Sequence, residues 1–145
     1  MVLPDTFLLQ SADVTAKLHK LGTVDDISCQ RSSAGVQLDI SSGLLSPTAF
    51  VEIGHWKELT SLYLTQTPTT DVDLEPLKEL PLRSLGLGGT KISDAGLVHL
   101  EALNKLEYLV LQNTAVSAPG IARLQQILTQ HTRQSPRSIR RPFLR

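Results

Sequence analysis

Aliphatic residues recur along this chain in blocks that repeat every 23 to 24 residues. The clearest block has apolar residues at Leu82, Leu85, Leu87, Ile92, Leu97, Leu100 and Leu103. The block before it has Leu59, Leu62, Leu64, Thr69, Leu74, Leu77 and Leu80. The block after it has Leu106, Leu109, Leu111, Val116, Ile121, Leu124 and Ile127. Periods of this length are typical of solenoid proteins, so the pattern predicts stacked repeats around one aliphatic core.

Each block contains the signals for one strand and one helix. The opening Leu-x-x-Leu-x-Leu ends in an alternation that predicts a short strand with one buried face. Ser93 and Asp94 suit a helix start, because their side-chain oxygens accept the free backbone N–H groups of a first turn. Leu97, Leu100 and Leu103 then follow at intervals of three, which places them on one helical stripe facing the strand.

A fourth, more divergent repeat begins at residue 35, with Pro47 in its first helical turn and Trp56 in a core position. Upstream, the pattern predicts a helix over about 12–21 and a strand over about 24–30. We expect this strand to pair antiparallel with residues 36–40 through a short turn.

The predicted organisation has three parts. An N-terminal cap covers residues 1–34, and a flexible basic tail covers residues 129–145. Four repeats occupy residues 35–128, with starts at 35, 59, 82 and 106.

The central block reads Leu-x-x-Leu-x-Leu-x-x-Thr-x-Ile-Ser-Asp-x-Gly-Leu-x-x-Leu-x-x-Leu from Leu82 to Leu103. It resembles the leucine-rich repeat, in the variant found in F-box substrate adaptors and many bacterial repeat proteins, although nothing like an F-box precedes it. The resemblance covers about residues 35–128. It implies an α/β solenoid, a right-handed arc with parallel strands on the concave face and helices on the convex face. It also implies protein recognition through the concave face.

Two groups of residues depart from the family pattern. Thr67, Thr90 and Thr114 stand where a conventional member carries Asn or Cys, and we expect their hydroxyls to bond inward to loop backbone. Asp73 and Ala118 replace the Gly and the Asp of the central helix start. We therefore expect looser helix starts in those two repeats.

The residues between the strand leucines point to the concave face. They form three columns: Gln37, Ser61, Ser84, Tyr108; Asp39, Tyr63, Gly86, Val110; and Ser41, Thr65, Gly88, Gln112. Both tyrosines lie there, and the two glycines between them predict a shallow trough open to a partner's approach. Tyrosine is enriched in interface hot spots. We expect a protein partner to bind at Tyr63, Thr65, Arg83, Gly86, Gly88, Tyr108, Val110 and Gln112, the alternative being that strand surfaces favour aromatics without any partner.

Charge is segregated along the chain, although its formal net charge is zero. No acidic residue follows Glu107, whereas six arginines do. Such a tail can neutralise phosphates, so contact with nucleic acid or an anionic membrane is the second functional hypothesis. Its residues would be Arg133, Arg137, Arg140, Arg141 and Arg145. A purely structural module of a larger assembly is the third.

The last repeat has no successor, which leaves a strand edge and an apolar face at the C-terminal end. Three occupants are open at this point. The tail's Phe143 and Leu144 can cover the end, a second copy of the chain can pair with it, or a partner can bind there. Equally, the chain can be a shortened relative of a longer repeat array.

Catalytic and metal-binding interpretations find little support. Asp71, Asp73 and Glu75 alternate as in a calcium loop, but no glycine follows at the turn position, and the register assigns Asp71 as a helix cap. The four histidines show no metal-ligand spacing. The Gly-rich segment 86–89 lacks the Lys-Ser/Thr ending of a phosphate loop. We expect no catalytic site, metal or cofactor.

Cysteine content and apolar runs suggest the compartment. The single cysteine, Cys29, cannot form an intramolecular disulfide, and we interpret it as a buried reduced thiol. The N-terminus lacks the features of a signal peptide, and no apolar run approaches the ~18 residues that span a bilayer. These features predict a soluble cytoplasmic protein.

Overall fold

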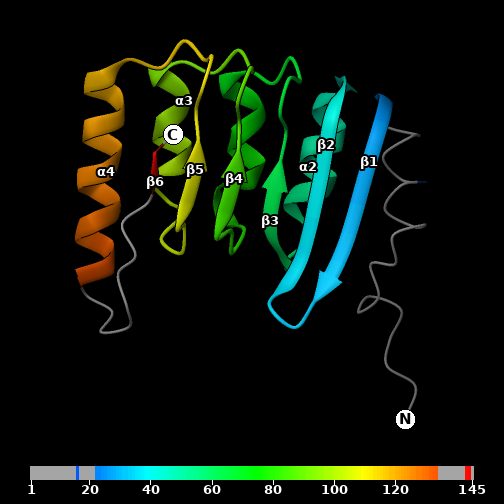
Figure 1. The fold of residues 1–145 in the computed structure, drawn as a ribbon, viewed down its shortest axis with the longest axis horizontal. Helices are drawn as coiled ribbons and strands as arrows, with labels where there is room; N and C mark the ends of the chain where they lie inside the picture. Colours follow the sequence, from blue (N-terminus) through cyan, green and yellow to red (C-terminus); the bar gives the residue numbers. More distant parts are fainter. Residues whose placement is uncertain (1–15, 17–21, 134–142, 145) are drawn as a thin grey trace.

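A computed structural model describes residues 22–133, 143 and 144, together with Ala16 (Figure 1). The elements in chain order are β1 (Gly22–Ser32), β2 (Gly35–Leu45), α2 (Pro47–Gly54), β3 (Leu59–Tyr63), the 3₁₀ helix η2 (Asp71–Glu79), β4 (Ser84–Gly86), α3 (Asp94–Leu100), β5 (Tyr108–Val110), α4 (Ala118–Arg133) and β6 (Phe143–Leu144). The fold class is mixed α/β.

The strands form one six-stranded sheet in sequence order. β1 and β2 pair antiparallel, and each later neighbour pairs parallel. The helices that connect the parallel strands lie together on one side of the sheet (Figure 1). The opposite side of the strands carries no helix among the described elements.

The N-terminal hairpin has the predicted pairing but longer strands. Ser32 pairs with Gly35, so the turn consists of residues 33 and 34, and the ladder continues to Gly22 and Leu45. The predicted helix over 12–21 lies outside the described residues except for Ala16, which is helical.

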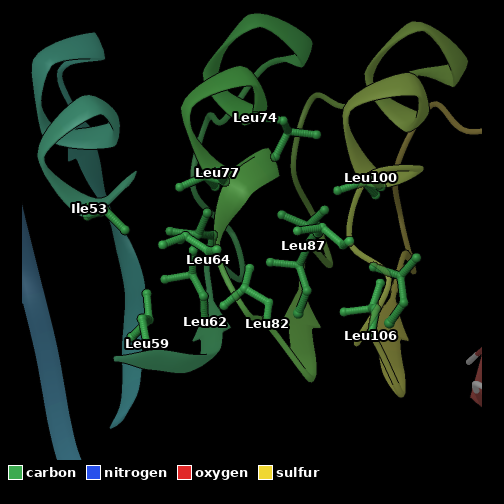
Figure 2. Packing of buried hydrophobic residues seen from close by; sticks show 14 of the residues in the cluster. Ile53, Leu59, Leu62, Leu64, Leu74, Leu77, Leu82, Leu87, Leu100 and Leu106 are labelled. Atoms are coloured by element: carbon green, nitrogen blue, oxygen red, sulfur yellow. The ribbon is translucent and has the colours of Figure 1, made fainter. Parts of the chain in front are cut away.

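The recurring leucines form one core between the sheet and the helices (Figure 2). Leu62, Leu85 and Leu109 pair with one another across β3, β4 and β5 and are almost completely buried. Trp56 is 6% exposed and belongs to the same core, as the repeat register predicts. Each repeat therefore buries its leucines against those of its neighbours.

The three ladder threonines behave as expected. Thr67, Thr90 and Thr114 each donate a hydroxyl hydrogen bond of 2.7 Å to the carbonyl of the leucine three residues earlier. The residue before each of them has a left-handed backbone, with φ of 59°, 72° and 56° at Gln66, Gly89 and Asn113. The turn after each strand thus has the same conformation in three repeats.

The helix starts confirm one assignment and overturn another. Ser93 caps α3, because its Oγ accepts from the Ala95 N–H at 3.3 Å. Asp71 was expected to cap its own helix, and this is wrong. Its carboxylate instead accepts hydrogen bonds from the Ser93 N–H at 2.7 Å and the Ser93 Oγ at 2.5 Å, in the next repeat.

The two departures from the family pattern have different outcomes. The segment that contains Asp73 forms a 3₁₀ helix, η2, and Pro76 inside it lacks the N–H that an α-helix needs there. The looser start expected at Ala118 is wrong, because Ser117 Oγ accepts from the Gly120 N–H at 3.1 Å and α4 continues for 16 residues.

Part of the predicted tail, residues 129–133, 143 and 144, is described by the structure. Residues 129–133 belong to α4, and Phe143 and Leu144 pair with Tyr108 and Leu109 as β6. Of the three open occupants of the sheet edge, the structure places the chain's own tail there. Within the described part of the chain, no helix is long and apolar enough to cross a membrane.

Candidate functional site

The outward residues of the strands line up across the sheet, on the side away from the helices. Strand register pairs Gln37 with Ser61, Ser84 and Tyr108 in one column, and Asp39 with Tyr63, Gly86 and Val110 in the next. The register confirms these two of the three predicted columns. We define the strand face as these eight residues together with Ser41, Thr65, Gly88 and Gln112.

Gly86 does not leave an open trough. The residue is buried, because the ring of Tyr63 lies over it from the neighbouring strand. A Cβ built on Gly86 would stand 2.5 Å from Tyr63 Cδ1. The missing side chain is the space into which the tyrosine ring fits, so the predicted approach to the backbone is wrong at this position.

Gly88 occupies the third column and is also buried. Its carbonyl accepts from the Gln66 N–H at 2.8 Å, and the Gln112 carbonyl accepts from the Gly89 N–H at 2.8 Å. A Cβ on Gly88 would stand 3.6 to 3.9 Å from its nearest neighbours in Gln112, Val110 and Thr65. This position has room for one more methyl group.

Tyr108 supplies the exposed aromatic surface of the strand face. Its side chain is 40% exposed, and its strand neighbours are Ser84 on one side and Phe143 of β6 on the other. Tyr63 is half-buried, whereas Thr65 and Gln112 are exposed. The structure therefore brings the two tyrosines onto one face, in adjacent columns and two strands apart.

Arg83 directly precedes β4 in the chain. Its Nε and Nη2 donate to Glu107 Oε1 at 3.0 and 2.6 Å, which links two successive repeats. Both side chains are substantially exposed, so the pair contributes little to stability. Arg83 borders the strand face, and its positive charge is paired with the negative charge of Glu107.

Asp39 and Ser41 belong to the strand face but not to the predicted partner site. Asp39 pairs with Tyr63 in the register, and its Oδ1 accepts from Ser41 Oγ at 2.9 Å. Asp39 is the one charged side chain among the residues that define the strand face. The column pattern alone could have added Asp39 to the predicted site, because Asp39 stands beside Tyr63, which was already part of it.

Among the described residues, the helix side includes two grooves that the repeat pattern did not indicate. One, of about 480 Å³, lies between α2 and η2 and includes Val51 and Val72. The other, of about 230 Å³, lies between α3 and α4 and includes Val98. These valines are exposed, but the charged residues that surround them are of both signs and select no ligand class.

Metal-binding and thiol groups occur among the described residues. No group of three or more His, Cys, Asp or Glu residues is placed to hold a metal ion there. Cys29 is a free, partly buried thiol. Burial raises the pKa of Cys29, and the charge of Arg31 offsets this in part, so the protonated thiol is favoured at neutral pH.

No protein-family model matches this chain, and searches of the curated proteins and of the solved structures found no match. The strand face is therefore the feature of this chain that bears on function. That face offers aromatic, hydroxyl and amide groups on a hydrogen-bonded strand framework.

Proposed function

We propose that this chain is a leucine-rich-repeat solenoid that binds a protein partner through the strand face and catalyses no reaction. In this proposal the parallel strands line the concave side of a right-handed arc, and the helices form its convex side. The repeating strand, Thr turn and helix support the solenoid, as do the shared core and the parallel sheet in chain order.

One observation carries the proposal. The register sets Tyr63, Gly86 and Val110 side by side, with Tyr108 in the adjoining column, on the side of the sheet without helices. A surface of this kind serves recognition because tyrosine provides a large contact area and loses little rotamer entropy on binding.

The packing of Tyr63 strengthens this argument. Its ring rests over Gly86, so part of the conformational freedom of the side chain is already lost in the free protein. Ordering of interface side chains costs about 0.5–1.5 kcal/mol each, and a preordered ring reduces that cost. Asp39 beside it adds a hydrogen-bond acceptor and a negative charge for a complementary donor.

The test uses the immobilised protein, extracts of its source cells and mass spectrometry of the bound proteins. The variant Tyr63→Ser/Tyr108→Ser removes both rings from the strand face. The matched control, Val72→Ser/Val98→Ser, alters side chains that are 73% and 55% exposed on the helix side. Circular dichroism confirms that each variant is folded.

We expect the unmodified protein and the valine control to recover the same partners. The tyrosine variant should lose them by about tenfold or more, because the affected residues are the aromatic anchors of the surface. Full recovery by the folded tyrosine variant would contradict the proposal, and so would loss in the valine control alone.

A further inference from the structure

Asp39 is the one charged side chain of the strand face, and it is half-buried. Its Oδ1 accepts a hydrogen bond from Ser41 Oγ at 2.9 Å, so the carboxylate is held on this face. Asp39 pairs with Tyr63 in the ladder between β2 and β3, and neighbouring strands lie about 4.8 Å apart. A carboxylate and an aromatic residue therefore stand at adjacent positions of the proposed partner surface.

Within residues 22–133, 143 and 144, no cation forms an ion pair with this carboxylate. Basic side chains in β1 and directly before β3 and β4 are paired with glutamates instead. The pairs are Arg31 with Glu58 at 2.6 Å, Lys57 with Glu79 at 3.6 Å, and Arg83 with Glu107 at 2.6 Å. Asp39 thus gives the strand face a negative charge that the described residues leave unmatched.

Tyr63 does not cover this carboxylate. Tyr63 Cδ1 stands 2.5 Å from the position of a Cβ on Gly86, and Gly86 lies in β4, across Tyr63 from Asp39. The tyrosine ring therefore leans away from Asp39, whose side chain stays partly exposed. A group that a partner supplies from solvent can reach both the carboxylate and the ring.

A partner that covers Tyr63 must also cover Asp39, because the two residues are neighbours in the ladder. Removing a carboxylate from water without a compensating charge or hydrogen bond is unfavourable. The hydroxyl of Ser41 uses only part of its acceptor capacity, since an ionised carboxylate has about four lone-pair sites. A neutral partner is therefore disfavoured at this position, and a partner with a cation is favoured.

Arginine fits this pair of residues better than lysine. Its planar guanidinium can donate two hydrogen bonds to a carboxylate and can also lie against an aromatic ring. A cation interacts favourably within about 6 Å of a ring centroid, a reach that the spacing of neighbouring strands permits. We propose that the strand face selects a partner that presents an arginine side chain to Asp39 and Tyr63, an inference that rests on the proposed function of this face.

The probes are three peptides that differ in one side chain: acetyl-Gly-Arg-Gly-amide, its lysine analogue and its citrulline analogue. Citrulline has nearly the shape of arginine but no charge, so the difference between these two peptides isolates the charge. Each peptide is titrated into the full chain at constant, low ionic strength, where exposed charges are least screened. The NMR signals of Asp39, Ser41 and Tyr63 report binding.

We expect saturable, millimolar binding of the arginine peptide, with signal changes centred on Asp39 and Tyr63. The citrulline peptide should bind more weakly by about tenfold or more, because it leaves the carboxylate without a charge partner. The lysine peptide should bind more weakly by about threefold, because an ammonium group is more strongly hydrated and lacks the planar fork of donors.

Two variants assign these differences to the two residues. Asp39→Asn keeps the shape of the side chain and should reduce the advantage of arginine over citrulline to about twofold or less. Tyr63→Leu should reduce the advantage of arginine over lysine and retain the advantage over citrulline. The control, Glu75→Gln, removes an exposed carboxylate of η2 and should preserve both differences. Circular dichroism confirms that each variant is folded.

Three results of the titrations would overturn the inference. One is the absence of saturable binding of the arginine peptide. Another is equal affinity for the arginine and citrulline peptides. The third is an advantage of arginine over citrulline that persists in Asp39→Asn, which would assign the peptide to a different carboxylate.

Partner recovery from cell extracts separates this inference from the proposed function. Asp39→Asn should lose the same partners as Tyr63→Ser/Tyr108→Ser, by about tenfold or more. Loss by the tyrosine variant with full recovery by Asp39→Asn would overturn the requirement for arginine and leave the proposed function intact. Full recovery by both variants would contradict the proposed function, and the inference with it.

Discussion

Aspartate side chains connect one repeat to the helix start of the next. Asp94 accepts from the N–H and Oγ of Ser117 at 2.7 and 2.5 Å, as Asp71 does from Ser93. The incoming carboxylate occupies the space where a Cβ on Gly120 would stand. The Ser-Asp-x-Gly pattern is thus one device shared by two repeats, in which the glycine makes room for the preceding aspartate.

This device explains why Asp73 is allowed where the later repeats have glycine. In the first repeat Pro47 stands in the aspartate position, so no carboxylate reaches forward to Thr70. Asp73 performs the task locally, and its Oδ2 accepts from the Thr70 N–H and Oγ1, each at 2.8 Å. Asp73 in place of glycine looks like a weak helix start. In the structure it supplies the carboxylate acceptor that the preceding repeat provides in the later repeats.

The Asp94 link predicts a specific dependence of stability on pH. The hydrogen bonds from Ser117 lower the pKa of Asp94 below its ordinary value. A lowered folded-state pKa contributes stability above the unfolded-state pKa, of about 3.9, and this contribution is lost as pH falls through the folded value. Asp94→Asn should therefore unfold at lower urea concentration at neutral pH, and the difference should shrink in acid.

The measurement is urea unfolding of both proteins at neutral pH and at several acidic pH values. Glu75→Gln is the control, because Glu75 only approaches Lys78 at 3.9 Å on the exposed surface of η2. A difference between Asp94→Asn and the parent that persists unchanged to the lowest pH would contradict the assignment of the lowered pKa to these bonds.

The two glycines of the strand face should respond differently to the same substitution. Gly88→Ala has room for its methyl group and should raise the free energy of unfolding by up to about 1 kcal/mol, because the unfolded chain loses entropy. Gly86→Ala must displace the Tyr63 ring and should be less stable than Gly88→Ala by about 1–3 kcal/mol. Urea unfolding and the NMR signals of the Tyr63 ring report these effects. Unmoved ring signals in Gly86→Ala would show that the ring does not rest there.

At the scale of elements, a glycine sets the distance between α2 and η2. A Cβ on Gly54 would stand 2.5 Å from the Pro76 carbonyl oxygen, and backbone atoms cannot rotate away as a side chain can. Gly54→Ala should therefore lower the free energy of unfolding by about 1–3 kcal/mol. Urea unfolding measures the loss, with Gly88→Ala as the same chemical change at a position that has space. Equal stability of the two variants would refute the close approach.

At the scale of the whole molecule, each repeat depends on its neighbours for burial. The core leucines lie between adjacent strands and helices in a continuous row (Figure 2), so much of the burial lies between neighbouring repeats of the sequence. Loss of a core side chain in one repeat should therefore weaken distant ones, provided the stack unfolds as one unit.

Leu109→Ala tests this cooperativity. Leu109 is fully buried in β5, and its truncation should cost about 2–5 kcal/mol. The buried Trp56 follows α2, at the other end of the parallel strands, and is the chain's single tryptophan. Urea unfolding followed by Trp56 fluorescence and by circular dichroism should shift together. A Trp56 transition that stays in place while the dichroism changes would show independent unfolding of the repeats.

Most of the architecture followed from periodicity. The leucine phase predicted which residues are core, which are outward and how the columns align across β2 to β5, because strand side chains alternate strictly between two faces. The hairpin and the threonine bonds also followed from local patterns. The hydrogen bonds that Asp71 accepts from Ser93 could not be predicted in this way, because a helix-cap pattern within one repeat does not indicate a bond to the next repeat.

The candidate site was also predicted only in part from the sequence. The strand pattern places Tyr63, Gly86 and Tyr108 on one face, but we expected the absent side chain of Gly86 to leave empty space. Only the packed structure shows that the ring of Tyr63 fills it, because a side chain leans toward whichever neighbour leaves room. Likewise, the sequence left three occupants open for the last edge, and the β6 pairing decided among them.

The sequence by itself determined the repeat length, the buried leucines and the residues of the strand face, because these depend on a period that each segment carries within it. The tertiary structure alone decided which aspartate bonds to which helix start, and how Tyr63 and Gly86 fit together. Those features are contacts between segments that are roughly one repeat or more apart, and neither segment specifies such a contact alone.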